Sequence, residues 1–255
     1  MKTMILIPAL MSIWITGPGQ ATTSLNTSGK VTYEEKMKLN IKLEGESAQY
    51  ANMIPKERTE KKLLYFTPEV SVYQGEKGKQ QPETVEQEEG GPMVQIRIEQ
   101  SEDKVYRDLK ANKKIEQRDF MTRLFLIESD AGNTDWKMTG EQKTILNFPC
   151  QAASTVKNGD TIRVWFTSAI PVPTGPRNFG NLPGLILSVD VNNGNQTLTA
   201  TSVEFMTPDK SLMQKPKEGK KVTAEQFKKI VDEKMKEMGA EGEGNGANVV
   251  IKINR

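Results

Sequence analysis

The clearest structural signal in this 255-residue sequence is Val31-Thr-Tyr-Glu-Glu-Lys-Met-Lys-Leu-Asn-Ile-Lys-Leu43. Its apolar side chains fall on odd numbers and polar side chains fill the even positions, so Glu35 is the one charge on the apolar side. A period of two is typical of a β-strand with one buried face. The alternation therefore predicts a long strand that packs one side against a core, after which 47–60 reads as a polar connection.

Short β-rich runs follow at close spacing through most of the chain. Two hairpins are signalled by Asn-Gly, in Lys157-Asn-Gly-Asp160 and Asn192-Asn-Gly-Asn195, and Asp130-Ala-Gly-Asn133 is a third candidate turn. Asn-Gly favours tight turns because both residues accept positive φ. The pattern predicts a mainly β protein, antiparallel rather than built of β-α-β units. The predicted strands after the first are 61–73 (broken at Pro68), 94–98, 104–109, 114–118, 123–128, 144–147, 151–156, 161–167, 185–191 and 197–205.

The period changes near the C-terminus, where Thr223 and Gln226 form a capping-box pattern. The helix that follows is expected to end at Gly239 and to pack on the sheet, because its polar face mixes acidic and basic residues. A flexible Gly/Glu segment at about 239–248 and an edge strand at 249–253 complete the chain. The apolar face of the helix carries Phe227, Ile230, Val231, Met235 and Met238.

The N-terminus predicts export. Lys2 precedes an apolar run from Met4 to Ile15, and small residues follow up to Ala21, as in a signal peptide that is cleaved there. No second apolar run is long enough to span a bilayer, so no integral membrane span is expected. We therefore expect a signal peptide at 1–21 and one β-rich domain at 22–255, with a disordered loop at about 74–92.

Composition restricts the chemistry. The chain has no histidine, and Cys150 is its one cysteine, which excludes Ser-His-Asp and Cys-His catalysis. No catalytic residue, metal site or cofactor is predicted, and the methionines read as core residues. With 35 basic and 33 acidic residues the charges nearly cancel, so no nucleic-acid partner is expected. Cys150 reads as a buried thiol, or alternatively as an unpaired thiol available to a partner.

Carboxylate pairs leave a hydrolase open as the alternative. Asp119 with Glu128, or Glu99 with Asp103, are pairs that neighbouring strands can bring together. Two carboxylates that flank a glycosidic bond are the usual machinery of polysaccharide hydrolysis. With 33 acidic residues in the chain, we favour exposed, solvated positions for these four.

The most distinctive segment runs from Trp136 to Val191. It includes Ile170-Pro-Val-Pro-Thr-Gly-Pro176 and Phe179-Gly-Asn-Leu-Pro-Gly-Leu-Ile-Leu187. This segment resembles the GLPGLI family, exported Bacteroidetes proteins of unknown function. Asn181 stands where the family motif begins with Gly, and Asn is the residue that best replaces Gly in a left-handed turn.

The proline-rich part of this segment has two readings. Prolines fix φ and remove backbone donors, so this path cannot lie in a central ladder. It is either a stiff corner between two strands, the reading we favour, or a rigid rim that contacts a ligand or partner. The residues of that candidate rim are Trp165, Pro171, Pro173, Pro176, Phe179, Leu182, Pro183 and Gly184.

The resemblance implies a place in the cell envelope, in the periplasm or at the outer membrane, because such proteins occur near outer-membrane nutrient receptors. The expected fold is a single curved antiparallel sheet, a half-barrel or open barrel like that of periplasmic lipoprotein carriers, with the C-terminal helix packed on it. The leading hypothesis is a non-catalytic binding or assembly protein. Its partner would be an outer-membrane receptor or an apolar, lipid-like ligand held in a groove lined by odd-numbered side chains of the first strand.

Overall fold

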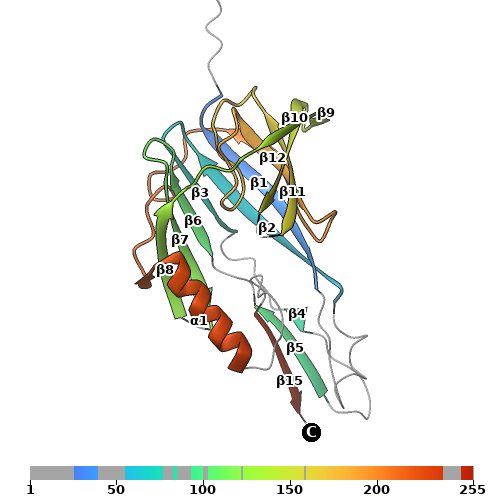
Figure 1. The fold of residues 1–255 in the computed structure, drawn as a ribbon, viewed down its shortest axis with the longest axis vertical. Helices are drawn as coiled ribbons and strands as arrows, with labels where there is room; N and C mark the ends of the chain where they lie inside the picture. The colour runs from blue at the N-terminus through green and yellow to red at the C-terminus, as the bar shows by residue number, and fades with distance from the viewer. Residues whose placement is uncertain are drawn as a thin grey trace, which may run out of the picture.

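The computed structural model describes residues 26–39, 55–76, 83–84, 93–99, 103–121, 123–157, 159–237 and 248–254. Twelve strands form one open sheet in which every neighbouring pair is antiparallel except β14 and β8 (Figure 1). The predicted fold class is confirmed. The strands lie in the order β14 (Lys220–Val222), β8 (Arg123–Asp130), β7 (Lys113–Phe120), β6 (Lys104–Asp108), β3 (Val70–Gly75), β2 (Glu57–Phe66), β1 (Gly29–Lys38), β13 (Gln196–Phe205), β12 (Leu185–Val191), β11 (Asp160–Thr167), β10 (Phe148–Lys157) and β9 (Lys137–Ile145).

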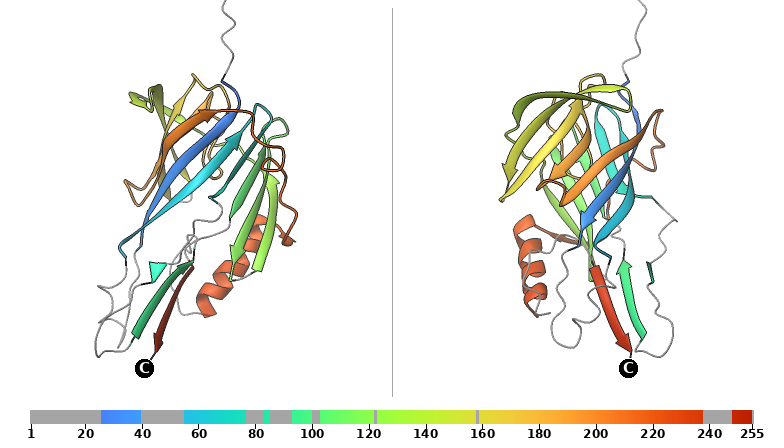
Figure 2. Two further views of the ribbon diagram at one scale, coloured as in Figure 1. Left: turned by 180° about the vertical axis from the view of Figure 1, so that it is seen from behind. Right: turned by 90° about the vertical axis from the view of Figure 1, so that its right-hand side faces the viewer.

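The sheet is strongly curved. Its last strands, β9 and β10, swing round to lie in front of β1 and β2, as the views of Figure 2 show. The side of the sheet that carries Val31, Tyr33 and Glu35 is called the inner face below. All three side chains are buried while Thr32 and Glu34 between them are half-buried, which confirms the predicted alternation of β1.

A second sheet of three strands contains β15 (Asn248–Asn254), β5 (Met93–Glu99) and β4 (Glu83–Thr84). The strands predicted at 94–98 and 249–253 exist, but they pair with each other and not with the large sheet. The expectation of one lone sheet is corrected here. About 150 residues separate the two partners in the sequence, and no local pattern reports so distant a pairing.

Both Asn-Gly hairpins are confirmed. Lys157 pairs with Asp160 in the β10–β11 hairpin, and Asn192 and Asn193 take positive φ in the β12–β13 hairpin. The third candidate turn also lies between two strands, and Gly132 takes φ 71°, but the strands that it joins are not paired with each other. The chain leaves β8 at Asp130 and crosses to β9, which pairs with β10 at the far edge of the sheet.

The helix α1 (Ala224–Glu237) begins as predicted. The backbone N–H of Gln226 donates to Thr223 Oγ1 at 3.2 Å. The backbone N–H of Thr223 donates to Gln226 Oε1 at 2.9 Å, which completes the capping box at the start of the helix. Phe227 packs edge-on against Phe120 and Phe125, with ring centroids 6.2 and 5.3 Å away. The predicted docking of the helix on the sheet is therefore confirmed.

Three strand predictions need correction. β2 begins at Glu57, inside the segment read as a connection. β9 covers Lys137–Ile145 rather than 144–147, and β14 was not predicted at all. β9 is an edge strand whose side chains are exposed on both sides, so its sequence shows no alternation. The predicted signal peptide, all but the last residue of the flexible segment at about 239–248 and most of the loop at about 74–92 lie outside the described residues.

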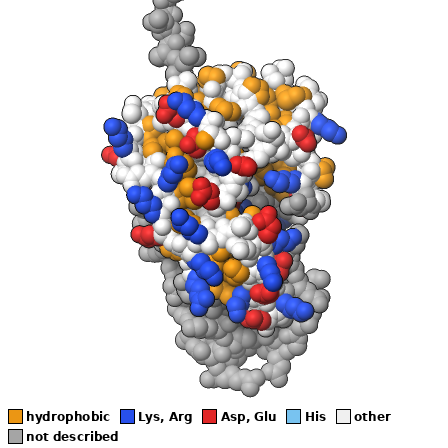
Figure 3. Space-filling model, turned by 60° about the vertical axis from the view of Figure 1, so that its left-hand side comes forward, with side chains coloured by type: hydrophobic (Ala, Val, Ile, Leu, Met, Phe, Trp, Pro, Cys, Tyr) orange, Lys and Arg blue, Asp and Glu red, His pale blue; other side chains and the backbone are white. Residues whose placement is uncertain are grey.

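None of the helices in the described ranges is long and apolar enough to cross a membrane. On the side that carries β8 and α1, basic and acidic side chains are interspersed with apolar ones (Figure 3). The core lies on the inner face and includes Tyr33, Leu64, Phe66, Phe166, Ile170, Leu185, Leu187 and Leu198.

Candidate functional site

The proline-rich segment between β11 and β12, residues 168–184, is called the crossing below. Its side chains alternate, because Ile170, Val172 and Thr174 are fully buried whereas Pro171 and Pro173 are exposed. Its backbone is tied to β12 through the Leu185 amide, which donates to the Ile170 carbonyl at 3.0 Å. The crossing therefore presents one side to the core and the other to solvent.

The inner face anchors the crossing from β3 and β6. Ser71 Oγ lies 2.7 Å from Thr174 Oγ1, and both residues are buried. Arg107, 2% exposed, donates to the Phe179 carbonyl at 2.6 Å and to Asn181 Oδ1 at 3.0 Å. Burial lowers the pKa of Arg107 to about 10. The buried guanidinium thus binds the crossing through oxygen acceptors that the turn supplies.

A second anchor comes from β1. Glu35 is 4% exposed, and its carboxylate accepts hydrogen bonds from three buried or half-buried donors. These are Tyr73 Oη at 3.1 Å, Gln196 Nε2 at 2.9 Å and the Arg177 guanidinium of the crossing. Arg177 has φ 51°, a left-handed conformation that a long side chain rarely adopts, and its ion pair with Glu35 compensates for that cost.

Trp136 and Asn181 complete the attachment on the other side. Trp136 Nε1 donates to the Gly180 carbonyl at 2.9 Å, and the Asn181 side-chain amide donates to the Gly132 carbonyl. Asn181 has φ 63°, which confirms that Asn takes the left-handed turn in place of Gly. A Cβ on Gly180 would lie 1.9 Å from Arg107 Nη1, so this glycine is required for the close approach of the guanidinium.

Two rows of charge lie beside these anchors on the inner face. Glu60 of β2 is opposite Glu35 and forms ion pairs with Arg58 and with Lys62, the latter at 2.8 Å. The second row, on β7, pairs Glu116 with Lys114 at 2.6 Å and with Arg118 at 2.8 Å.

Burial acts to raise the pKa of Glu116, but the charges of Arg118 and Lys114 outweigh it and hold the pKa below its usual value. Each carboxylate of the two rows is matched to cations. The arrangement favours rigid attachment rather than proton transfer.

The structure separates the eight candidate rim residues into two sets. Pro171, Pro173 and Pro183 are exposed and Phe179 is half-exposed. Trp165 is 9% exposed and lies beneath the Lys143 ammonium, 4.2 Å from its ring. The remaining three, Pro176, Leu182 and Gly184, are buried.

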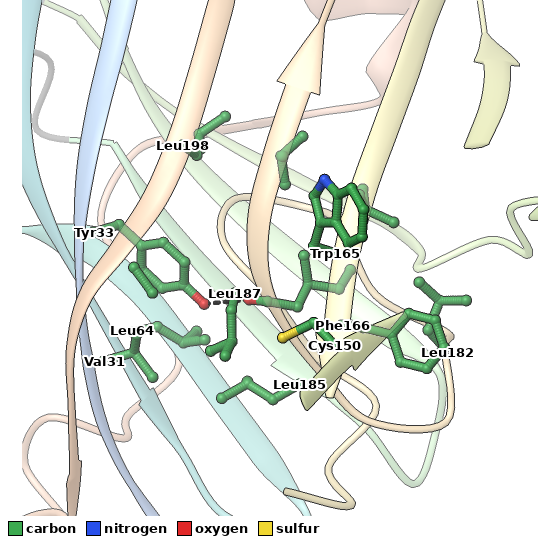
Figure 4. Packing of buried hydrophobic residues seen from close by; sticks show 14 of the residues in the cluster. Val31, Tyr33, Leu64, Cys150, Trp165, Phe166, Leu182, Leu185, Leu187 and Leu198 are labelled. Carbon is green, nitrogen blue, oxygen red and sulfur yellow. Dashed lines mark hydrogen bonds between the residues drawn. The ribbon is translucent and has the colours of Figure 1, made fainter. Parts of the chain in front are cut away.

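The part of the first strand that the structure describes lines no apolar groove, and Ile41 and Leu43, which were also expected to line it, lie outside the described residues. Val31 and Tyr33 are 0% exposed, and Tyr33 Oη donates to the Ile186 carbonyl at 2.5 Å within the packed core (Figure 4). The crossing and β12 fill the space that a ligand would have occupied, because their own apolar side chains satisfy the inner face. A groove at these side chains is therefore excluded.

Of the two carboxylate pairs considered for the alternative hydrolase, Asp119 and Glu128 are not brought together. In the β7–β8 ladder Asp119 lies opposite Leu124, and Glu128 lies opposite Ile115, so the two acids are four residues apart along the strand, roughly 13 Å. Asp103 instead binds Arg118 at 2.9 Å. The side chain of Glu99, the expected partner of Asp103, lies outside the described part of the structure.

Cys150 is buried at 2% exposure, as the first reading predicted, and burial raises the pKa of its thiol. Within the described ranges no cluster of three acidic or cysteine side chains is arranged to hold a metal ion.

Sequence reasoning missed Arg107, Tyr73 and Ser71 as anchors of the crossing, because nothing near them in the sequence marks them. Glu35 did carry a signal, since it interrupts an apolar alternation.

Comparison with known proteins identifies relatives of this architecture. Residues 61–229, more than half of the chain, match the model of the family described as N-glycanase peptide, N-terminal domain. Two solved structures of PNGF-II, in space groups C2 and P21, align with a TM-score of 0.53 and 19% identity over 80% of this chain. The alignments span 32% and 33% of those chains, so this chain matches about a third of their length. No curated protein matches the sequence. The likeness to the solved structures concerns the fold, and the family match shows that the chain belongs to the N-glycanase N-terminal domain family.

Proposed function

We propose that this chain is an exported, non-catalytic binding protein of the cell envelope, and that it recognises its partner with the exposed side of the crossing. The observation that carries the proposal is the double-sided character of this segment. Buried bonds from Glu35, Ser71 and Arg107 hold one side. The other side displays Pro171 and Pro173 to solvent.

Such a surface suits recognition for an entropic reason. Binding costs conformational entropy whenever a loop must be ordered, and a segment that is already fixed avoids that cost. Prolines contribute further, because they restrict φ in the unbound chain. The crossing is thus already ordered in the unbound protein, so a partner that binds it does not have to pay the entropy cost of fixing a loop.

The name of the family suggests the class of partner. An N-glycanase acts on N-glycans. In PNGF-II the part that resembles this chain makes up about a third of a longer chain. We propose that the partner is an N-glycosylated protein rather than a free fatty acid. The filled interior supports this choice, since Val31 and Tyr33 leave no apolar groove.

A binding experiment with a matched pair of partners tests the proposal. A glycoprotein that carries one N-glycan and the same protein after removal of the glycan are each titrated against the immobilised chain. We expect the glycosylated form to bind more tightly, and the double variant P171E/P173E to lose this binding. The control Q151E/V156E places the same two negative charges on exposed positions of β10 and should bind normally. Equal binding of both forms, or equal loss in the control, would show the partner class or the surface to be wrong.

The hydrolase alternative has one specific candidate. Glu35 and Glu60 are opposite each other in the β1–β2 ladder, where Cβ atoms lie about 5 Å apart and the carboxyl groups are within reach of the roughly 5 Å separation of a retaining pair. Both are buried and bound by cations or donors, which leaves no acid ready to protonate a leaving group. Release of reducing sugar from envelope polysaccharide, lost in E35Q and E60Q, would establish the alternative instead.

We also propose that the chain is a member of the GLPGLI family and works beside an outer-membrane receptor. Support comes from the motif segment itself, which forms the crossing and the buried start of β12. A photocrosslinking residue at the exposed position Asn178, activated in whole cells, tests the association. Adducts with an outer-membrane receptor would support it, and adducts with soluble proteins alone would contradict it.

A further inference from the structure

A second surface of unusual composition lies on the outer side of the sheet. Residues 206–221, called the strap below, run from the end of β13 into the first two residues of β14. They contain five lysines but only two acidic residues, Asp209 and Glu218. The strap alone thus has a formal charge of +3, which exceeds the +2 of the whole chain. Its lysines are Lys210, Lys215, Lys217, Lys220 and Lys221.

The strap is fixed against the outer face of β6 and β7. Gln117 Nε2 donates to the Glu218 carbonyl at 2.9 Å, and the Lys215 ammonium lies 5.5 Å from the centre of the Tyr106 ring. Gly219 has φ 126° and packs so close to the backbone of Leu124 that a Cβ would lie 3.0 Å away. These contacts fix the backbone that carries the lysines.

The lysine side chains of the strap remain in solvent. All five are exposed, and in the described structure none of them forms an ion pair. Two lysines of the β6–β7 hairpin behave differently, because Lys110 in its turn binds Glu69 and Lys114 of β7 binds Glu116. The strap therefore presents positive charge that the protein itself does not neutralise.

We propose that the strap docks on an anionic lipid surface, independently of the function proposed for the crossing. Juxtaposed lysines are attracted to the negative potential of anionic lipids. The strap also begins at Met206, which is 43% exposed next to Phe205 at 44%, so exposed apolar side chains stand at the start of the charged segment. The strap has no arginine and no aromatic residue, the side chains that read and stack nucleic-acid bases.

Vesicle sedimentation tests this proposal with the full mature chain. Vesicles of phosphatidylcholine and phosphatidylglycerol in equal parts are compared with vesicles of phosphatidylcholine alone. We expect binding to the anionic vesicles only, and release at roughly 0.5 M salt, where charges are screened within a few ångströms. The variant K217E/K221E should bind about tenfold more weakly or worse, since each lysine contributes severalfold to the partition.

The control variant K137E/K157E makes the same change of charge at exposed lysines of β9 and β10, far along the sheet from the strap. It should bind as the unchanged protein does, and circular dichroism should show both variants folded. Equal loss in the two variants, or no binding of the unchanged protein to anionic vesicles, would overturn the proposal. Binding to a DNA duplex without binding to vesicles would overturn the choice of a lipid partner.

Discussion

The two ends of the inner face are closed in different ways. Along β1, Val31 and Tyr33 pack among apolar side chains of β2 and β12, whereas Glu35, two residues on, lies among charges. Apolar burial is non-directional, so the first end accepts any covering segment of suitable volume. Charged hydrogen bonds require specific partners at specific positions. The charged end is therefore what determines where the crossing lies.

The largest test of this difference is E35L. The substitution leaves the Arg177 guanidinium without the carboxylate it binds, and breaking a buried pair typically costs about 3–5 kcal/mol. Unfolding in urea measures the loss. The matched control is E34L, on the opposite side of β1, where the pair with Lys36 is largely exposed and contributes about 1 kcal/mol or less. Similar losses in both variants would break the comparison.

A substitution at Gly184 tests the packing at the end of the crossing, where the chain enters β12. A Cβ at this position would lie 2.1 Å from the Thr167 carbonyl oxygen, so G184A must displace backbone and should cost about 1–3 kcal/mol or more. Gly140 of β9 also has positive φ, but no atom lies within 4 Å of its Cβ position. We expect G140A to cost about 1 kcal/mol, and thermal unfolding of the two variants makes the comparison. A smaller effect at Gly184 than at Gly140 would contradict the packing described here.

Two buried tyrosines sharpen the comparison further. Tyr73 Oη donates to the Glu35 carboxylate, and Tyr33 Oη donates to a neutral carbonyl. Hydrogen bonds to charged groups contribute about 1.5–3 kcal/mol, against about 1 kcal/mol for neutral ones. Y73F should therefore destabilise the fold more than Y33F in the same urea titration. A larger loss of stability in Y33F than in Y73F would contradict the comparison, because the hydrogen bond at the apolar end would then contribute more.

The smallest expected effect concerns the two buried tyrosines and the stability of the fold at alkaline pH. Burial raises the pKa of both Tyr33 and Tyr73 above the value of 10 that they have when exposed. Above about pH 10 the unfolded chain releases these protons and the folded chain retains them, so the free energy of unfolding falls as pH rises. The lowered pKa of Arg107 and Arg177 acts in the opposite direction, but equally in every variant.

The double variant Y33F/Y73F isolates the tyrosine contribution. We expect its free energy of unfolding to decline less between about pH 9 and pH 11 than that of the unchanged protein. The measurement is a series of urea titrations across this range. An unchanged slope would show that neither hydroxyl is buried as described.

Much of the sheet could be predicted because its strands alternate or are joined by tight turns. β1 is buried on one side, and its sequence alternates between apolar and polar residues. β12 is buried on both sides, and its sequence is mostly apolar. β9 could not be found, since both of its sides are exposed and Lys, Thr, Gly and Glu fill it. β14 has three residues, too few for any period to appear.

The site was predictable in part. Proline and glycine mark the crossing itself, because those residues restrict or free the backbone wherever they occur. Its anchors carry no such mark. Arg107 lies 72 residues from Phe179, and Glu35 lies 142 residues from Arg177, so only the folded sheet brings them together. The exposed or buried state of each proline likewise depends on which side those anchors bind.

A double-mutant cycle between Glu35 and Arg177 tests most directly whether charge fixes the crossing in place. E35Q, R177Q and the double variant are compared with the unchanged protein by urea unfolding. We predict a coupling free energy of about 1.5–3 kcal/mol, with the double variant more stable than the sum of the single losses implies. A coupling near zero would contradict the account, because the Glu35–Arg177 pair would then contribute nothing to holding the crossing in place.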